Sequence, residues 1–235
     1  MAITHGTAHN GGQAPTTAPE SPMRRTTLEP VDLQRVAIVE TLPAADPAPL
    51  GLAAFALTTF LLSAFNAQWT RGTAAWIGFA LAYGGLAQLL AGMWEFRNRN
   101  VFGATAFSTY GAFWIGLALY VLLVVPANKP TPIQLENDLG WILLGFLIVN
   151  SYLLLWSVFV SKAVFAVFFT LEVTLILLVI GNFSATPHVI EAGGIAGVVT
   201  AAVAWYASSA GLVNGMTRRV VLPVGKPLTL KPAGE

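Results

Sequence analysis

The stretch from Asn98 to Trp114 reads N-R-N-V-F-G-A-T-A-F-S-T-Y-G-A-F-W and joins two apolar segments of the chain. Four of its residues fall at positions i, i+3, i+4 and i+7 and so share one face of a helix: Phe107, Tyr110, Gly111 and Trp114. Hydrocarbon cannot hydrogen-bond the hydroxyl groups that cluster around this face. The composition therefore favours a surface that faces protein or a solute, and we interpret it as a wall of a narrow pore.

The composition of the whole chain predicts an integral membrane protein. The 235 residues are 55% hydrophobic and 10% charged, with a mean hydropathy of +0.68, whereas soluble domains carry about 25% charged residues. A net charge of +1 gives no reason to expect a nucleic-acid partner. The chain has no cysteine, and its three histidines lie outside the apolar segments, so we expect neither a metal site nor a cofactor.

Six apolar stretches are each long enough to cross a hydrocarbon core, which takes about 20 helical residues. We expect an all-α fold with transmembrane helices at Leu50–Gln68, Thr73–Trp94, Thr105–Val125, Leu139–Val160, Ala163–Gly181 and Val189–Leu212. The proline-rich segment 126–138 is predicted to be a loop, with Asn137 or Asp138 capping the helix that follows.

Lys and Arg are distributed unequally between the two ends of these helices. Ten flank one end, and only Arg71 and Lys129 flank the other. Because cytoplasmic loops carry the excess of Lys and Arg, both termini are predicted to be cytoplasmic. We expect one transmembrane domain, residues 45–216, between a disordered N-terminal tail, 1–44, and a C-terminal tail, 217–235.

Two of the predicted helices carry stripes of small residues. One face of the second holds Gly84, Gln88, Ala91, Gly92 and Glu95, and one face of the sixth holds Gly193, Gly197, Ala201, Ala204, Ser208, Gly211 and Gly215. Small residues let helices approach closely, so both stripes predict tight packing. A buried Gln88 also needs hydrogen-bond partners, so its face is either a helix contact or a polar group beside a solute path.

Glu172 is the acidic residue in the middle of a predicted span. An ionised carboxylate at that depth costs at least about 2.5–3.5 kcal/mol. Glu172 is therefore either protonated or directed toward water or a polar partner. It is a candidate proton carrier, with Glu95 as the second candidate, and the alternative is a carboxyl group with a purely structural role.

No motif in the chain favours an enzyme. The sequence has no nucleophile elbow, zinc-protease helix, phosphate-binding loop or dinucleotide fingerprint. Close-packed helices with a few inward hydroxyl, amide and aromatic groups are typical of a protein that conducts a small solute. The first, third and fifth helices would begin at the cytoplasmic end, where their N-termini, Arg97 and Arg99 attract an anion.

Three motifs, in this order, resemble those of the acetate uptake transporter family, also called the YaaH or succinate-acetate transporters. Asp46–Leu52 resembles the helix-entry signature N-P-A-P-L-G-L. Gly84–Glu95 and Asn100–Trp114 are similar to the blocks G-G-x-x-Q-x-x-A-G-x-x-E and G-N-T-F-G-x-T-A-F-x-S-Y-G-x-F-W. The resemblance covers roughly residues 45–225.

The helix-entry motif departs from the family at Asp46, which replaces an Asn. Asp46 can still cap a helix, Pro47 and Pro49 fit a first helical turn, and Gly51 completes the motif. The negative charge of Asp46 at a pore mouth would oppose anion entry unless a basic residue pairs with it. A second departure is Glu172, where relatives carry a small hydroxyl residue.

The resemblance implies a six-helix protomer that assembles as a homo-hexamer in the plasma (cell inner) membrane. It also implies transport of acetate, and often of succinate, by proton symport or through a channel. Members of the family narrow at a Phe, a Tyr and a Leu, which match Phe55, Tyr110 and Leu171. Ala204 matches a position linked to dicarboxylate handling.

A neck of this composition can select solutes by size. Bulky Phe55 and Leu171 would reject larger solutes and gate by dewetting, while Tyr110, Thr105 and Ser108 would donate hydrogen bonds to a carboxylate. Two alternatives remain open. One is export of ammonium or passage of ammonia or another small weak acid, and the other is a sensor or scaffold that transports nothing.

Overall fold

The computed structural model describes residues 44–72 and 74–228. Every regular element in this part is helical: α2 (Ala48–Asn66), α3 (Trp76–Leu81), the π-helical η1 (Ala82–Ala87), α4 (Gln88–Arg97), α5 (Val101–Leu119), the π-helical η2 (Tyr120–Val124), α6 (Val125–Asn128), α7 (Pro132–Ser157), α8 (Lys162–Phe183) and α9 (Pro187–Thr217). The tail predicted over residues 1–44 lies outside the described residues except for Ala44, as do the last residues, 229–235, of the predicted C-terminal tail.

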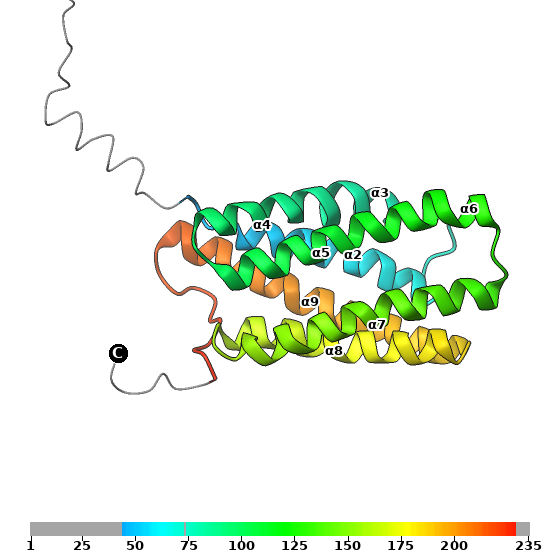
Figure 1. Ribbon diagram of the computed structural model, residues 1–235. Helices are drawn as coiled ribbons and strands as arrows, with labels where there is room; N and C mark the ends of the chain where they lie inside the picture. The colour runs from blue at the N-terminus through cyan, green and yellow to red at the C-terminus, as the bar shows by residue number, and fades with distance from the viewer. Residues whose placement is uncertain (1–43, 73, 229–235) are drawn as a thin grey trace, which may run out of the picture. The chain divides into compact units, whose positions relative to one another are not determined.

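These elements join into six helices that are long and apolar enough to cross a membrane: Ala48–Asn66, Trp76–Arg97, Val101–Asn128, Pro132–Ser157, Lys162–Phe183 and Pro187–Thr217. Each overlaps one of the predicted spans, so the prediction of an all-α fold with six candidate membrane helices is confirmed. The start of α2, the end of α4 and the end of α9 lie at one end of the bundle, and α6 lies at the other (Figure 1).

The loop predicted over residues 126–138 is wrong, because most of this segment is helical. α6 continues to Asn128 and ends where Lys129 adopts a left-handed backbone conformation, with φ of 47°. α7 begins at Pro132, whose missing N–H is not needed in the first turn. Pro132 therefore marks the start of a helix, and only residues 129–131 connect α6 to α7.

The residue that caps α7 also differs from the prediction. Thr131 and Gln134 form a capping box: the Thr131 hydroxyl accepts from the Gln134 N–H at 3.3 Å, and the Gln134 side chain accepts from the Thr131 N–H at 2.9 Å. Asn137 and Asp138 lie inside the helix, and Asp138 instead accepts a hydrogen bond from the Tyr120 hydroxyl at 2.9 Å.

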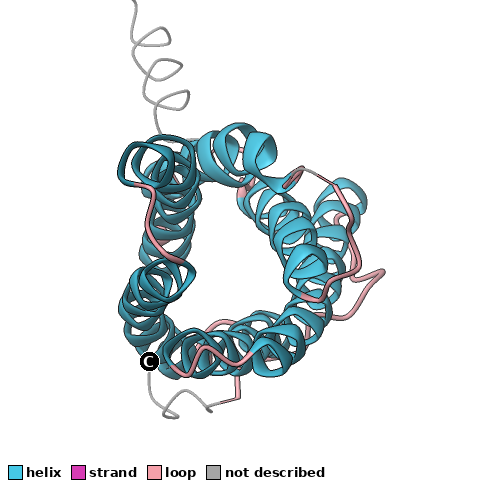
Figure 2. Ribbon diagram, turned by 90° about the vertical axis from the view of Figure 1, so that its right-hand side faces the viewer, coloured by secondary structure: helices cyan, strands magenta, loops and turns pink. Residues whose placement is uncertain are grey.

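The helices form a ring when the bundle is seen along its axis (Figure 2). α2 packs against α9 on one side and against η1 and α4 on the other. α9 then packs on α8, α8 on α7, and α4 on α5, while α5 and α7 touch and close the ring. The ring places α2, α5 and α8 around a common interior.

The small-residue stripe of α9 packs tightly, as predicted. A Cβ added to Gly193 would lie 2.7 Å from a methyl carbon of Leu178 on α8, and one added to Gly197 would collide with the side chain of Ser63 on α2. The stripe thus lets α9 sit close to both neighbours. Gly215 lies past this contact, with nothing within 4 Å of an added Cβ.

Candidate functional site

Two cavities lie inside the described bundle, one of about 100 Å³ and one of about 40 Å³. The wide cavity is lined by the N-terminal halves of α2, α5 and α8, together with Gln88 and Glu95 of α4. The narrow cavity is lined by the C-terminal halves of α2, α5 and α8, together with Leu143 and Phe146 of α7. The cavities therefore follow one another along the bundle axis.

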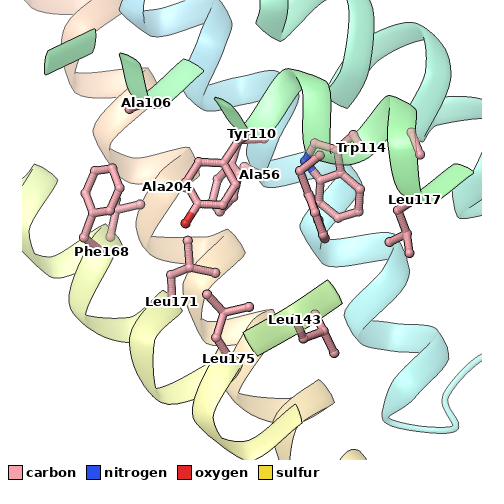
Figure 3. Close-up of a cluster of buried hydrophobic side chains, with 14 of the residues drawn as sticks. Ala56, Ala106, Tyr110, Trp114, Leu117, Leu143, Phe168, Leu171, Leu175 and Ala204 are labelled. Carbon is pink, nitrogen blue, oxygen red and sulfur yellow. The ribbon is translucent and has the colours of Figure 1, made fainter. Parts of the chain in front are cut away.

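Three side chains line both cavities: Phe55 of α2, Tyr110 of α5 and Leu171 of α8. We call these three residues the neck. Each is buried and lies near the middle of its helix. The rings of Phe55 and Tyr110 meet edge to face, with centroids 5.6 Å apart, and the Tyr110 oxygen points toward Leu171 (Figure 3). The structure thus brings together the three residues that the resemblance singled out.

Behind the neck, a chain of hydrogen bonds connects α5, α7 and α8. The Tyr110 hydroxyl donates to Asn150 Oδ1 at 2.7 Å. Asn150 Nδ2 donates to the Phe168 carbonyl at 3.1 Å and to Glu172 Oε2 at 2.7 Å. Ser151 Oγ donates to Glu172 Oε1, also at 2.7 Å. Glu172 is therefore directed toward polar partners on α7, which is one of the alternatives that the sequence left open.

Two buried polar side chains of α4 face the wide cavity. Gln88 and Glu95 are each 1% exposed, and the Oε1 atom of each has no hydrogen-bond partner among the described residues. A Cβ on Gly103 would lie 2.8 Å from the Glu95 carboxyl carbon and 2.6 Å from Asn100 Nδ2. Gly103 therefore allows Glu95 and Asn100 to approach the start of α5, where the Asn100 side chain accepts the Gly103 N–H at 3.1 Å.

The helix-entry motif fixes the start of α2 against its neighbours. Pro47, and not Asp46, occupies the N-cap position of α2, and the Asp46 carboxylate one residue earlier accepts the Ala48 N–H at 2.9 Å. The Pro49 carbonyl accepts a hydrogen bond from Ser208 Oγ of α9 at 2.6 Å. A Cβ on Gly51 would lie 2.8 Å from the ring of Phe107, so glycine makes room for a side chain that lines the wide cavity.

Some predicted pathway residues line neither cavity. Thr105 donates its hydroxyl to the Val101 carbonyl at 2.8 Å, and Ser108 is not part of either lining. Ala204 is fully buried in the same apolar cluster as the neck residues. Asn150 links Glu172 by hydrogen bonds to Tyr110 of the neck. The roles given to these residues stay predictions.

Residues 27–227 match the GPR1/FUN34/yaaH family along most of the chain. The chain belongs to the GPR1/FUN34/yaaH family. The resemblance to acetate uptake transporters is therefore confirmed. This is a family of transporters and channels and not of enzymes, and carboxylate transport is its function at the family level. The chain is accordingly a multi-pass membrane protein.

Individual members of the GPR1/FUN34/yaaH family show how similar the chain is. It is 35% identical over 192 residues to the succinate-acetate/proton symporter SatP of Escherichia coli, with 77% of this chain and 96% of SatP covered. It is 43% identical over 175 residues to ammonia transport outward protein 2 of Saccharomyces cerevisiae, with 72% of this chain covered. The match spans 62% of that yeast protein's length.

A solved structure of a family member has the same fold. The structure of the bacterial acetate channel SatP superposes with a TM-score of 0.70 at 32% sequence identity. The match covers 77% of this chain and 99% of the SatP chain. The similarity therefore extends over nearly the whole of the bacterial protein.

Proposed function

We propose that this chain transports acetate, and other small carboxylates such as succinate, along the axis of its own helix bundle. The observation that carries the proposal is that Phe55, Tyr110 and Leu171 line both cavities. A solute that moves from one cavity to the other must pass these three side chains. Family-level carboxylate transport and the 35% sequence identity to a succinate-acetate/proton symporter support the same substrates.

The neck would select among solutes by their size and by the free-energy cost of removing their water. Phe55 and Leu171 offer only carbon to the passage, and the Tyr110 hydroxyl is the polar group of the neck. A two-carbon acid loses little hydration in such a short constriction, whereas a larger dicarboxylate meets both a steric and a desolvation barrier. The proposal therefore ranks acetate above succinate.

The wide cavity would collect the solute. The first turns of α2, α5 and α8 contribute to its lining, and helix N-termini attract anions through their free N–H groups and dipoles. Capping side chains use part of this capacity, since Ser161 accepts the Val164 N–H of α8 at 3.2 Å. The Gln88 Oε1 atom, which has no hydrogen-bond partner among the described residues, supplies a further polar group in the same space.

Proton coupling is the part of the proposal that concerns Glu95 and Glu172. Glu95 is the better placed of the two, because it lines the wide cavity while Glu172 lines neither. Replacing Glu172 with Gln keeps the size of the side chain and removes its ability to carry a proton. If Glu172→Gln leaves the pH dependence of acetate uptake untouched, Glu172 takes no part in the coupling.

We further propose that both termini are cytoplasmic, that the transmembrane domain of residues 45–216 lies in the plasma membrane, and that the chain forms a homo-hexamer. The charge asymmetry supports the orientation: Arg97, Arg99 and Lys162 lie at the end that holds the wide cavity. The resemblance supports the assembly and the membrane. On this orientation, the wide cavity lies on the cytoplasmic side of the neck.

A second candidate function is passage of ammonia or ammonium. It is favoured by the 43% identity to ammonia transport outward protein 2. The neck has no feature that would exclude a solute smaller than acetate.

Flux into proteoliposomes tests these proposals. Purified protein is reconstituted, and uptake of radiolabelled acetate, radiolabelled succinate and ammonium is compared with uptake into protein-free vesicles of the same lipid. That control is required because neutral acetic acid and ammonia cross lipid unaided. We expect protein-dependent acetate uptake that exceeds succinate uptake. Flux of ammonium alone would favour the second function, and no protein-dependent flux would favour a sensor or scaffold.

A further inference from the structure

We infer that Asn150 orients the Tyr110 hydroxyl. In this orientation the Tyr110 oxygen can accept a hydrogen bond from a solute at the neck, but the hydroxyl proton is not available for donation to that solute. The inference rests on the proposed function and specifies the form of the solute. A solute that passes this oxygen must itself be the hydrogen-bond donor. For acetate, that form is the neutral acid.

The orientation of the Asn150 amide is fixed by its partners. Its Nδ2 lies 3.1 Å from the Phe168 carbonyl oxygen and 2.7 Å from Glu172 Oε2. A backbone carbonyl can only accept. Turning the amide round would place Oδ1 against this carbonyl with no proton between the two oxygens. Nδ2 must therefore face α8, and Oδ1 must face Tyr110.

The direction of the next hydrogen bond follows. Asn150 Oδ1 lies 2.7 Å from Tyr110 Oη and can only accept, so the tyrosine hydroxyl donates. A phenol carries a single proton, and this bond uses it. Asn150 is fully buried, so releasing that proton toward the passage would leave a buried carbonyl oxygen without its donor.

With the Tyr110 proton used, the neck offers a solute no side-chain hydrogen-bond donor. Phe55 and Leu171 have no polar side-chain atoms, so a carboxylate anion finds no side-chain donor at the neck and loses water against carbon. Acetic acid can donate its O–H to the free lone pair of Tyr110 Oη. Asn150 and Glu172 line neither cavity. They act on the solute through Tyr110 and are positioning residues.

The sign of the membrane potential separates the two forms of the solute. A neutral acid carries no charge, so its uptake is the same whichever side of the membrane is positive. A potential of 100 mV sustains an accumulation ratio of about 50-fold for a monovalent anion. Radiolabelled acetate uptake is measured in proteoliposomes whose potential is set by a potassium gradient and valinomycin, with protein-free vesicles subtracted. A dye in the lumen records acidification.

For the unmodified protein, we expect equal uptake at either potential and acidification that follows acetate entry. Leu has the same number and branching of side-chain heavy atoms as Asn but no acceptor, so Asn150→Leu frees the Tyr110 proton for an anion. We expect Asn150→Leu uptake to become severalfold greater with the lumen positive, and acidification to fall relative to acetate entry. Tyr110→Phe in the same chain should abolish this shift, because Asn150 acts through the hydroxyl.

Ser157→Ala is the matched control. Ser157 is also a fully buried polar residue of α7, its hydroxyl donates to the Leu154 carbonyl at 2.6 Å, and it lines neither cavity. We expect it to show no dependence on potential. Acetate uptake by the unmodified protein that follows the potential overturns the inference and leaves the proposed function standing, even if Asn150→Leu fails to fold. Absence of protein-dependent acetate uptake overturns both.

Discussion

Leu171 and Leu153 are buried leucines of adjacent helices, 6% and 3% exposed, yet only Leu171 lines the cavities. Replacing either with Ala should cost about 2–5 kcal/mol of folding free energy, because each leaves a cavity. Only Leu171→Ala widens the neck. We therefore expect Leu171→Ala to raise succinate uptake relative to acetate severalfold, measured by competition of succinate against radiolabelled acetate.

Leu153→Ala serves as the control for general loosening of the bundle. An equal change of the succinate-to-acetate ratio in both variants would mean that the neck does not set the size limit. An unchanged ratio in Leu171→Ala would remove Leu171 as the filter.

Phe55 and Tyr110 lie in or beside sequence motifs, and Leu171 was matched through the family resemblance alone. The hydrogen bonds behind these three neck residues could not be predicted in either way. Glu172 and Asn150 are 22 residues apart on separate helices, and their contact depends on how α7 and α8 are rotated about their axes. Thr105 was predicted to line the pathway, but its hydroxyl bonds its own helix. A hydroxyl inside a helix can bond the carbonyl four residues before it, as Thr105 does, so its presence near the pore predicts no contact with a solute.

At the scale of elements, Gly197→Ala and Gly215→Ala compare a packed and an open position of α9. Gly197→Ala would place a methyl group against Ser63 of α2 and 3.2 Å from a methyl carbon of Thr174 on α8. We expect a loss of about 1–3 kcal/mol from overpacking, seen as a lower melting temperature in detergent. Gly215→Ala meets nothing within 4 Å and should be neutral or slightly stabilising, since Ala favours helix over Gly. Equal melting temperatures would contradict the packing assigned to the stripe.

Helix existence was predictable, but local helix geometry was not. Hydrophobic length gave all six spans, because only a helix satisfies its backbone within hydrocarbon. The π-helical turn η1 interrupts the second span with no Pro in or beside it, whereas η2, in the third span, is followed two residues later by Pro126. η1 precedes Gln88 directly, and its Gly84 packs against Thr58 of α2. Such a turn depends on contacts with neighbouring helices, which no local pattern records.

At the scale of the whole molecule, the ring of helices explains why a neck forms at mid-depth. Phe55, Tyr110 and Leu171 stand near the middle of α2, α5 and α8, and these three helices run in the same direction through the bundle. Their large side chains therefore meet at one level, and the two cavities lie on either side of it. On the proposed transport route, a solute would therefore meet its main barrier at this one level.

The proposed orientation of the bundle in the membrane rests on the basic residues, and cysteine labelling can test it. Six of the eight basic residues in the described part lie at the wide-cavity end, and Arg71 and Lys129 lie at the other. The chain has no native cysteine, so Arg71→Cys, Lys129→Cys and Lys226→Cys each introduce a single exposed thiol. Because loops rich in Lys and Arg stay in the cytoplasm, we expect a membrane-impermeant maleimide to label the first two in intact cells and Lys226→Cys only after permeabilisation. Labelling of Lys226→Cys in intact cells would reverse the assigned orientation.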